Sequence, residues 1–317
     1  MMNIDLPRPF FVLAPMDDVT DSVFRSVVAE TARPDLFFTE FVNVDGLQSP
    51  GRPKLLKKLQ HTSEEQPLIA QIWGLKPENF FETAKQIVNG EFGTFAGIDL
   101  NMGCPEKNVV RNGACSALIQ NRDLAREIIE ATIRGANGKL PVSVKTRLGL
   151  SVIDLTWHEF LFGFKLDMLT IHGRTQKEMS KVPNHWDEIG KVRELRDRLA
   201  PQTLLVGNGD VMSRQQGIEL AAQYKLDGIM IGRGIFHDPF IFADESPWET
   251  YTKEQRMALY QTHVKRFAET WKNNERPTHT LNKFCKIYIN GFDGAKELRE
   301  ELMQSQTPEE LLRILQA

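Results

Sequence analysis

The sequence predicts an α/β protein, a (β/α)8 TIM barrel followed by a smaller C-terminal domain that is all helical. Eight short apolar runs alternate with amphipathic stretches up to about residue 243, and the alternation then stops. The runs recur at intervals long enough for the crossover helices that parallel strands require. We therefore expect a barrel domain over residues 1–243 and a helical domain over residues 244–317. An open, doubly wound sheet is the alternative that the pattern leaves.

The expected strands are short apolar runs bounded by turn-forming residues. They span residues 10–14, 36–39, 68–72, 97–101, 142–146, 168–172, 204–207 and 228–231. Between the strands, helical periodicity is clearest over residues 79–88, 123–133, 189–199 and 215–223.

The tail is expected to form helices over residues 254–271, 281–288, 294–303 and 308–315. Thr307-Pro308-Glu309-Glu310 is typical of a helix start. Threonine caps the helix, proline suits its first position, and acidic residues favour its first turn.

Composition limits the class of protein. The chain has 317 residues, of which 41% are hydrophobic, so it can bury a large core. No apolar run approaches the roughly 20 residues that span a bilayer, and residues 1–9 lack the features of a signal peptide. The three cysteines, Cys104, Cys115 and Cys285, show neither a disulfide framework nor paired metal spacing. We expect a cytoplasmic monomer with no membrane contact and no metal. The net charge of −3 excludes a uniformly basic protein, but a local basic face can still bind nucleic acid.

Candidate site residues follow from the fold, because ligands of a parallel barrel bind at the carboxyl ends of its strands. In strand order, the residues expected there are Pro15 and Met16, Gln71, Asn101 and Cys104, Lys145 and Arg147, His172 and Arg174, Asn208-Gly209-Asp210, and Gly232-Arg233. Polar and basic groups therefore converge on one rim of the barrel.

The glycine-rich turns after the seventh and eighth strands favour a phosphate site. Backbone N–H groups of such turns point at an anion, and Arg233 can add a charge-assisted hydrogen bond. The simpler interpretation is that these glycines only make tight turns. Two such turns at these two strands, one of them followed by arginine, favour phosphate.

Lys145 lies inside the apolar run Val142-Ser143-Val144-Lys145-Thr146, where a buried ammonium needs a partner. A ligand carbonyl or anion is the better interpretation, since a closed barrel has no exposed edge strand. The amides of Gln71 and Asn101 suit the edge of a flat heterocycle. His172 is either a core histidine or a ligand contact.

Cys104 lies at the tip of a turn in Asn101-Met102-Gly103-Cys104-Pro105, at the end of the fourth strand. It could be a buried structural thiol, a nucleophile with a lowered pKa, or a proton donor. The reference thiol pKa of about 8.5 already keeps the donor form at neutral pH. We interpret Cys115 and Cys285 as structural.

Six motifs in register resemble the tRNA-dihydrouridine synthases. They are Ala14-Pro15-Met16 with Thr20-Asp21, Asn101-x-Gly103-Cys104-Pro105, Val144-Lys145-x-Arg147-Leu148-Gly149, His172-Gly173-Arg174-Thr175, Asn208-Gly209-Asp210 and Met230-Ile231-Gly232-Arg233-Gly234. Gly291-Phe292-x-Gly294-Ala295-x-Glu297-Leu298-Arg299 also resembles that family's helical domain. Asp17-Asp18, and Gln120-Asn121-Arg122-Asp123 without a proline, depart from the family pattern and leave the subfamily and the modified tRNA position open.

The resemblance implies an FMN-dependent enzyme that reduces a specific uridine in tRNA to 5,6-dihydrouridine, with NADPH as the reductant. Reduced FMN would deliver hydride to C6 of the uracil, and Cys104 would protonate C5 from the opposite face. Lys145 would stabilise negative charge on the reduced flavin. The cofactor-binding residues would be Pro15, Met16, Asp17, Gln71, Lys145, His172, Asn208, Gly209, Asp210, Gly232 and Arg233.

A uracil in folded RNA must be turned out of its stack, and the phosphates around it need a basic surface. Asn101 would lie near the base, and Arg147, Arg174, Lys177, Lys283 and Lys286 would contact the tRNA. Lys107, Arg111, Lys181, Arg276 and His279 are further candidates. The ordinary alternative for each surface cation is a solvated face.

Two other functions fit parts of the sequence. Another FMN barrel, of the dihydroorotate dehydrogenase type, would share the phosphate site and a lysine, but it leaves the helical tail and the basic rim unexplained. An RNA-binding barrel that has lost catalysis would not need Cys104, Lys145 and Arg233.

Overall fold

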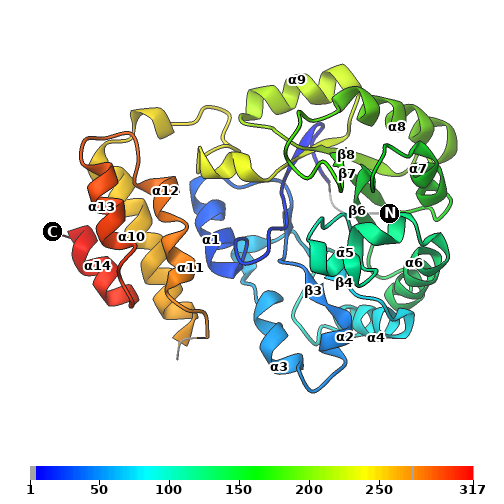
Figure 1. Cartoon of the computed structure of the whole chain (residues 1–317), viewed down its shortest axis with the longest axis horizontal. Coiled ribbons are helices and arrows are strands. Elements are labelled where there is room, and N and C mark those ends of the chain that lie inside the picture. Colours follow the sequence, from blue (N-terminus) through cyan, green and yellow to red (C-terminus); the bar gives the residue numbers. More distant parts are fainter. Residues whose placement is uncertain (1–4, 273–274, 317) are drawn as a thin grey trace.

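A computed structural model, which describes residues 5–272 and 275–316, has a parallel β-barrel beside a helical region (Figure 1). The strands are β1 (Phe10–Leu13), β2 (Phe37–Phe38), β3 (Val42–Asn43), β4 (Leu68–Trp73), β5 (Gly97–Met102), β6 (Val142–Gly149), β7 (Met168–Thr175), β8 (Leu204–Asn208) and β9 (Gly228–Ile231). All eight expected strands are present, and the short β3 adds to the edge of β4. The TIM-barrel class is therefore confirmed.

The barrel closes between its first and second strands. The strand order is β1-β9-β8-β7-β6-β5-β4-β2, with every pair parallel. A single bridge joins Val12 to Leu36, and the Leu13 N–H donates to the Leu36 carbonyl at 3.1 Å. The weakest seam of the barrel therefore lies at β1 and β2, which are both short.

Helices cover the outside of the barrel (Figure 1). The longer ones are α1 (Ser22–Thr31), α4 (Pro77–Val88), α6 (Arg122–Ala136), α7 (Leu155–Phe162), α8 (Trp186–Leu199) and α9 (Arg214–Tyr224). The short helices α2 (Val44–Leu47) and α3 (Arg52–Leu55) lie in the connection before β4, and α5 (Lys107–Arg111) lies in the loop after β5. The last of the eight expected strand–helix repeats is incomplete, because β9 is followed by a short 3-10 turn, Arg233–Phe236, and not by a long helix. This places the chain after β9 at the mouth of the barrel.

The helical region contains a 3-10 turn at Trp248–Thr250 and the helices α10 (Lys253–Thr270), α11 (His279–Asn282), α12 (Cys285–Tyr288), α13 (Ala295–Leu302) and α14 (Pro308–Gln316). The stretch expected as one helix over residues 281–288 is divided between α11 and α12. The expected cap of the last helix is confirmed, since the Glu310 N–H donates to Thr307 Oγ1 at 3.2 Å. None of the helices that the structure describes is long and apolar enough to cross a membrane.

The helical region packs against α1. The Phe24 and Phe284 rings stack with centroids 5.2 Å apart. Trp271 Nε1 donates to Asp21 Oδ2 at 2.9 Å, and an Arg266 N–H donates to Ser26 Oγ at 3.2 Å. One continuous core cluster holds residues of both parts, so the two regions are joined by buried apolar surface and not by a free linker.

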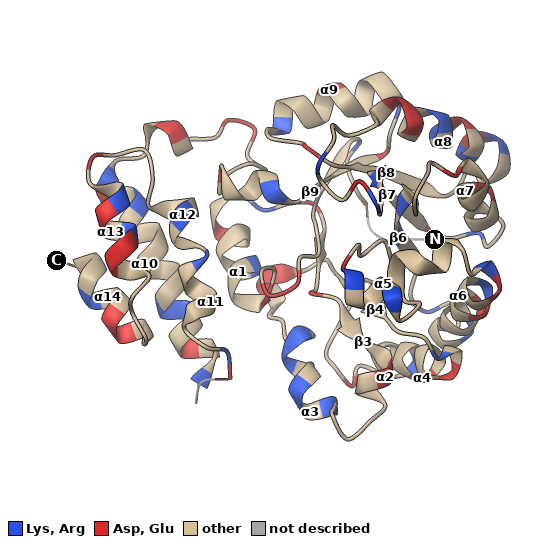
Figure 2. Ribbon diagram, in the orientation of Figure 1, with Lys and Arg blue, Asp and Glu red and all other residues tan. Residues whose placement is uncertain are grey.

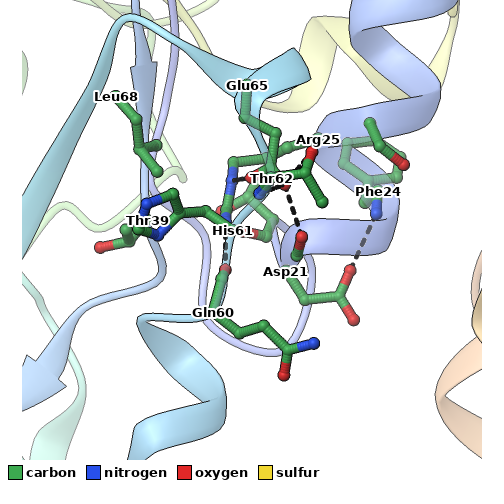
Figure 3. Close-up of polar contacts among 12 residues, drawn as sticks. Asp21, Phe24, Arg25, Thr39, Gln60, His61, Thr62, Glu65 and Leu68 are labelled. Carbon is green, nitrogen blue, oxygen red and sulfur yellow. Dashed lines mark hydrogen bonds and ion pairs between the residues drawn. The ribbon is translucent and has the colours of Figure 1, made fainter. Parts of the chain in front are cut away.

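A buried ion pair ties α1 to the loop that precedes β4 (Figure 3). Arg25 Nε lies 2.5 Å from Glu65 Oε2, and both side chains are fully buried. The Arg25 guanidinium also donates to the carbonyls of Thr20 and Gln60 at 2.6 and 2.8 Å. Because a buried charge needs every hydrogen bond it can make, this pair fixes the chain that follows β1 at the rim.

The inside of the barrel has an apolar part and a polar part. Side chains at alternate strand positions point inward. The apolar ones form a buried cluster of Phe10, Val12, Ala14, Leu36, Phe38, Ile69, Met168, Val206 and Met230. The same alternation on β4, β5 and β6 brings Gln71, Asp99, Asn101, Ser143 and Lys145 inward. A polar wall therefore stands on one side of an otherwise apolar barrel.

Candidate active site

A cavity of about 500 Å³ opens at the carboxyl ends of the strands. Its walls come from the ends of β1 and of β4 to β9 and from the loops after them. The lining residues are Ala14, Pro15, Met16, Phe41, Gln71, Asn101, Gly103, Cys104, Pro105, Lys145, Arg147, His172, Asn208, Gly209, Asp210, Val211, Met212, Met230, Gly232, Arg233, Gly234, Phe236 and His237. The volume suits a ligand of nucleotide size.

One end of the cavity is a cradle of backbone after β8 and β9. Gly209 has φ +129° and Asp210 has φ +53°, so the turn after β8 is left-handed at two successive positions. A Cβ at Gly209 would lie 2.0 Å from Asn184 Oδ1, so the turn requires glycine at this position. A Cβ at Gly232 would lie 3.6 Å from the Ala14 Cβ and 4.0 Å from the Met16 sulfur. A side chain there would occupy the floor of the cavity.

Three arginines surround this cradle, and they differ in exposure. The Arg233 side chain is 59% exposed and lies 3.4 Å from Asp210 Oδ1. Arg174 is buried, pairs with the same carboxylate, and donates to the Val182 carbonyl at 2.6 Å. Arg147 is also buried. The Asp210 carboxylate therefore carries two arginine partners, and Arg233 is the arginine open to a ligand.

A chain of hydrogen bonds fixes the amides of the polar wall. Gln71 Nε2 donates to Asp99 Oδ2 at 2.7 Å, and Ser143 Oγ donates to Asp99 Oδ1 at 2.5 Å. Gln71 Oε1 accepts from Asn101 Nδ2 at 3.1 Å. Asn101 Oδ1 in turn accepts from the N–H groups of Gly103 and Cys104, at 3.1 and 3.0 Å. Because Asp99 can only accept hydrogen bonds when ionised, it sets the direction of the whole chain up to the Cys104 loop.

Burial dominates the electrostatics of this wall. It raises the pKa of Asp99 to about 6, against hydrogen bonds from Ser143 and Gln71. It lowers the pKa of Lys145 to about 8, and the nearby Arg147 charge adds to the effect. It also lowers the pKa of His172 well below its ordinary value, with Arg147 and Lys145 as the next causes. His172 is therefore a neutral imidazole at pH 7, whereas most of Lys145 carries its charge.

Cys104 lines the cavity from the loop after β5 and is partly buried. A hydrogen bond from the Cys115 thiol is the main cause that lowers the pKa of Cys104, to about 7, in spite of burial. The Glu106 backbone N–H and the Arg147 charge lower the pKa further. The loop is held in place because Arg147 Nε donates to the Gly103 carbonyl at 2.7 Å and Ser116 Oγ donates to the Cys104 carbonyl at 2.8 Å.

Comparison with known families gives the identity of this barrel. The family model described as "Dihydrouridine synthase (Dus)" matches residues 12–317. The chain belongs to the dihydrouridine synthase family. A Staphylococcus aureus (strain COL) protein named "Probable tRNA-dihydrouridine synthase" is 49% identical over 314 residues, which cover 98% of this chain and 93% of that protein. "Probable tRNA-dihydrouridine synthase 2" of Bacillus subtilis (strain 168) is 49% identical over 315 residues, which cover 98% and 94%.

Solved structures share the fold. Histamine dehydrogenase from Rhizobium sp. 4-9 aligns with a TM-score of 0.56 and 13% identity, over 84% of this chain and 51% of that one. A structure of morphinone reductase aligns with a TM-score of 0.52 and 11% identity, over 76% and 86%. At such low identity, the likeness shows the barrel fold alone.

The cavity collects most of the predicted site residues. Of the expected cofactor-binding residues, those that line it are Pro15, Met16, Gln71, Lys145, His172, Asn208, Gly209, Asp210, Gly232 and Arg233, together with Asn101 and Cys104. Asp17 is not in the lining and pairs with Lys58. The roles assigned to these residues stay predictions.

The expected tRNA contacts separate into three groups. Lys177 is exposed but outside the cavity lining, whereas Lys283 and Lys286 line a second cavity. Arg147 and Arg174 are 5% and 2% exposed, so they are not exposed cations of the rim. Arg147 lines the first cavity whereas Arg174 does not, and the tRNA contact expected of both stays a prediction. Arg276 is also buried and pairs with Glu40. A sequence shows the charge of an arginine, but not the carbonyls and carboxylates that the fold brings around it.

Sequence reasoning missed five residues of the site. Phe41, Met212, Phe236 and His237 line the cavity from loops, where no periodic pattern marks them. Cys115 was interpreted as structural, yet its thiol contacts that of Cys104. The one available signal was its position, 11 residues after Cys104 at the other end of the same loop.

Proposed function

We propose that this chain catalyses the FMN-dependent, NADPH-driven reduction of a specific uridine in tRNA to 5,6-dihydrouridine, and that it does so as a cytoplasmic monomer. Two relatives named as probable tRNA-dihydrouridine synthases align with this chain over almost their whole length. The observation that carries the proposal is that one cavity joins a glycine cradle, a buried lysine and a partly buried thiol. The cradle suits the phosphate of a cofactor, and the lysine and the thiol suit the chemistry of a base bound beside it.

The residues present fit FMN. The cradle at Gly209, Asp210 and Gly232 offers backbone donors and free space to a phosphate, and Arg233 is open to it. Met16 and Ala14 provide an apolar floor for a flat ring. Lys145 and Gln71 reach the cavity from the polar wall. When bound and reduced, FMN supplies a hydride, which reduces the C5–C6 double bond of uracil at C6.

Cys104 supplies the matching proton at C5. Hydride at C6 and a proton at C5 together saturate the double bond, and the thiol becomes a thiolate that solvent protonates again. The Cys115 hydrogen bond and the Arg147 charge stabilise that thiolate. Lys145 holds a positive charge where the bound cofactor gains negative charge, and the fixed Asn101 amide orients the base.

The RNA lies across the mouth of the barrel in this proposal. Among the candidate cations, Lys107, Arg111, Lys177 and Lys181 are exposed near the ends of β5 and β7. Arg174 is engaged by the protein through all three guanidinium nitrogens, so it positions the site. Arg147 uses Nε and Nη1 for backbone carbonyls and still lines the cavity, so it faces the substrate in this proposal.

The direct test is to map dihydrouridine in tRNA from cells that lack this protein and to restore it with the purified protein. We expect one uridine position to lose the modification and to regain it on addition of protein and NADPH. A purified protein with flavin absorbance that leaves tRNA unchanged and turns over dihydroorotate would favour the other FMN barrel. A protein that binds tRNA but takes up no flavin would favour the binding function.

A further inference from the structure

A second cavity, of about 520 Å³, opens next to the first. It lies between the barrel and the helical region, with Val19 on one side and the α11–α12 segment on the other. Phe236 and His237 line both cavities. One extended ligand can therefore occupy both cavities and stay in contact with the protein between them.

The second cavity has an apolar body. Val19, Phe236 and Ile287 line it. The Phe284 ring also contributes, but it is 5% exposed and already stacks on Phe24, so it presents only an edge. The Phe236 ring is therefore the aromatic surface that remains for a ligand.

The edge of the cavity is cationic. Lys283 and Lys286 both line it. Lys283 Nζ donates to the Asp18 carbonyl, and it lies 5.5 Å from the Phe284 ring centroid. Within the described residues, the Lys286 ammonium has no ion pair or hydrogen bond. It is the cation that is free to bind an anion.

The acidic residues close to the cavity are already paired. Glu40 binds Arg276, and Asp18 and Asp21 lie 3.6 and 3.5 Å from the same guanidinium. Asp17 binds Lys58. The Asn290 amide is also satisfied, since it accepts from Arg256 at 2.9 Å and donates to the Lys286 carbonyl at 2.9 Å. The Phe236 ring and the Lys286 ammonium are therefore available for recognition, next to the exposed His237 imidazole.

We propose that the second cavity is a subsite for the RNA nucleotide next to the target uridine, with its base on Phe236 and its phosphate at Lys286. This inference rests on the proposed function. Turning the uridine out of its stack also exposes the face of its neighbour. Stacking on an aromatic side chain replaces the lost base–base contact, and it does so for any of the four bases. Two adjoining cavities with shared walls suit two consecutive nucleotides of one strand.

The test combines changes in the RNA with changes in the protein. Affinity is measured for the unmodified tRNA and for two versions in which the base on the 5′ or the 3′ side of the target uridine is removed. The proteins are the FMN-loaded wild type, Phe236→Ala, Phe236→Tyr, Lys286→Ala and, as a matched control, Lys296→Ala. Lys296 lies in the same helical region, and its side chain is 76% exposed outside both cavities.

We expect removal of one neighbouring base to weaken wild-type binding about tenfold, the scale of one base–aromatic stack. Phe236→Ala should weaken binding of intact tRNA to a similar degree and should lose nothing more when that base is absent. Phe236→Tyr should bind like the wild type. Lys286→Ala should weaken all three RNAs equally and reduce the slope of log affinity against log salt by about one, whereas Lys296→Ala should change neither.

If Phe236→Ala and base removal lower the affinity independently, so that their effects add in the double change, the subsite is overturned. It is also overturned if removal of either neighbouring base leaves the wild-type affinity unchanged. If NADP⁺ binding falls in Phe236→Ala while the RNA effects are absent, the cavity belongs to the reductant and the inference is wrong. Should Phe236→Ala fail to fold, the abasic tRNAs on wild type and on Lys286→Ala decide the question alone. A wild-type protein that neither binds nor reduces intact tRNA would remove the proposed function and the subsite together.

Discussion

At the scale of single residues, the acidity of Cys104 is the property that most affects the proposed reaction. The Cys115 thiol donates a hydrogen bond that lowers the pKa of Cys104 to about 7. The reference value near 8.5 would leave almost all of the thiol protonated at neutral pH. In this chain the Cys104 thiol and its thiolate are therefore present in similar amounts near pH 7. The thiol can release its proton at this pH, and the thiolate can take up a proton from solvent.

The first prediction is a pH dependence. In the proposed reaction the protonated thiol is the active form, so the rate of uridine reduction by the reduced enzyme should fall as pH rises through about 7. Cys115→Ala removes the main group that stabilises the thiolate, so the pKa of Cys104 should rise and the fall should move to higher pH. Single-turnover oxidation of the reduced enzyme by tRNA, followed from about pH 6 to pH 9, measures both profiles. Identical midpoints would show that Cys115 does not set this acidity.

The second prediction concerns Asp99, which does not itself line the cavity. It accepts a hydrogen bond from Gln71, a lining residue, and Gln71 in turn accepts from Asn101. Asp99→Ala leaves the Gln71 donor and the Ser143 hydroxyl without their acceptor. We expect a loss of about 1–3 kcal/mol in the free energy of unfolding, and slower uridine reduction because Asn101 is no longer held.

Asp99→Asn is the matched control, because one amide oxygen can still accept from Gln71. Urea unfolding and single-turnover rates measure the two effects. Full activity in Asp99→Ala would show that the amide chain has no part in positioning the substrate.

At the scale of elements, the turn after β8 is the part of the site that tolerates substitution least. Gly209 has a left-handed φ and lies against Asn184, so a methyl group there meets both strain and a clash. We predict that Gly209→Ala lowers the ratio of bound flavin to protein after gel filtration.

Gly138→Ala is the control, because Gly138 also has a positive φ, of 68°, yet a Cβ there meets no atom within 4 Å. It should lose some stability and retain the flavin. Equal flavin loss in both variants, or none in Gly209→Ala, would argue against a cradle at this turn.

The elements that the sequence predicted well are those with a simple local signal. Each of the eight expected strands is a buried apolar run, and burial on both faces is what parallel strands require. The helix expected over residues 281–288 is split at Lys283 and Phe284, between α11 and α12, where the Phe284 ring stacks on Phe24. No local pattern predicts such a contact between residues 260 positions apart.

In the site, too, residues with a local sequence signal were predictable and residues placed by distant contacts were not. Residues at or just after strand ends, such as Asn208 and Arg233, were predictable because the fold places strand ends together. Phe236 and His237 were not, since they lie on the turn that takes the place of the last barrel helix. The burial of Arg147 depends on carbonyls of three other segments, at Gly103, Thr175 and Met179.

At the scale of the whole molecule, positive and negative residues are interspersed over the surface, with local groups of cations (Figure 2). One such group lies on α3 and on the 3-10 turn Leu56–Lys58 that follows it, where Lys57 Nζ donates to the Glu275 carbonyl at 3.0 Å. Other cations, such as Lys107 and Lys181, follow the carboxyl ends of β5 and β7. The acidic net charge does not prevent RNA binding, because an RNA that crosses the mouth meets this face and not the whole surface.

The fourth prediction uses the two ends of the barrel. Lys107→Glu with Lys181→Glu should weaken tRNA binding and reduce its salt dependence, since both lysines lie beyond carboxyl ends of strands. Lys139→Glu with Lys165→Glu makes the same charge change just before β6 and β7, at the opposite end. Equal losses of affinity in the two pairs would mean that net charge alone controls binding, and that the mouth is not the RNA face.

The measurement that tests the central claim most directly is a single turnover of the Cys104→Ala variant. The variant is loaded with FMN, reduced with NADPH and mixed with unmodified tRNA, and dihydrouridine is mapped in the product. The account predicts flavin content and flavin reduction equal to wild type and almost no dihydrouridine. Dihydrouridine formed at the wild-type rate would contradict it, because the proton at C5 would then come from another group.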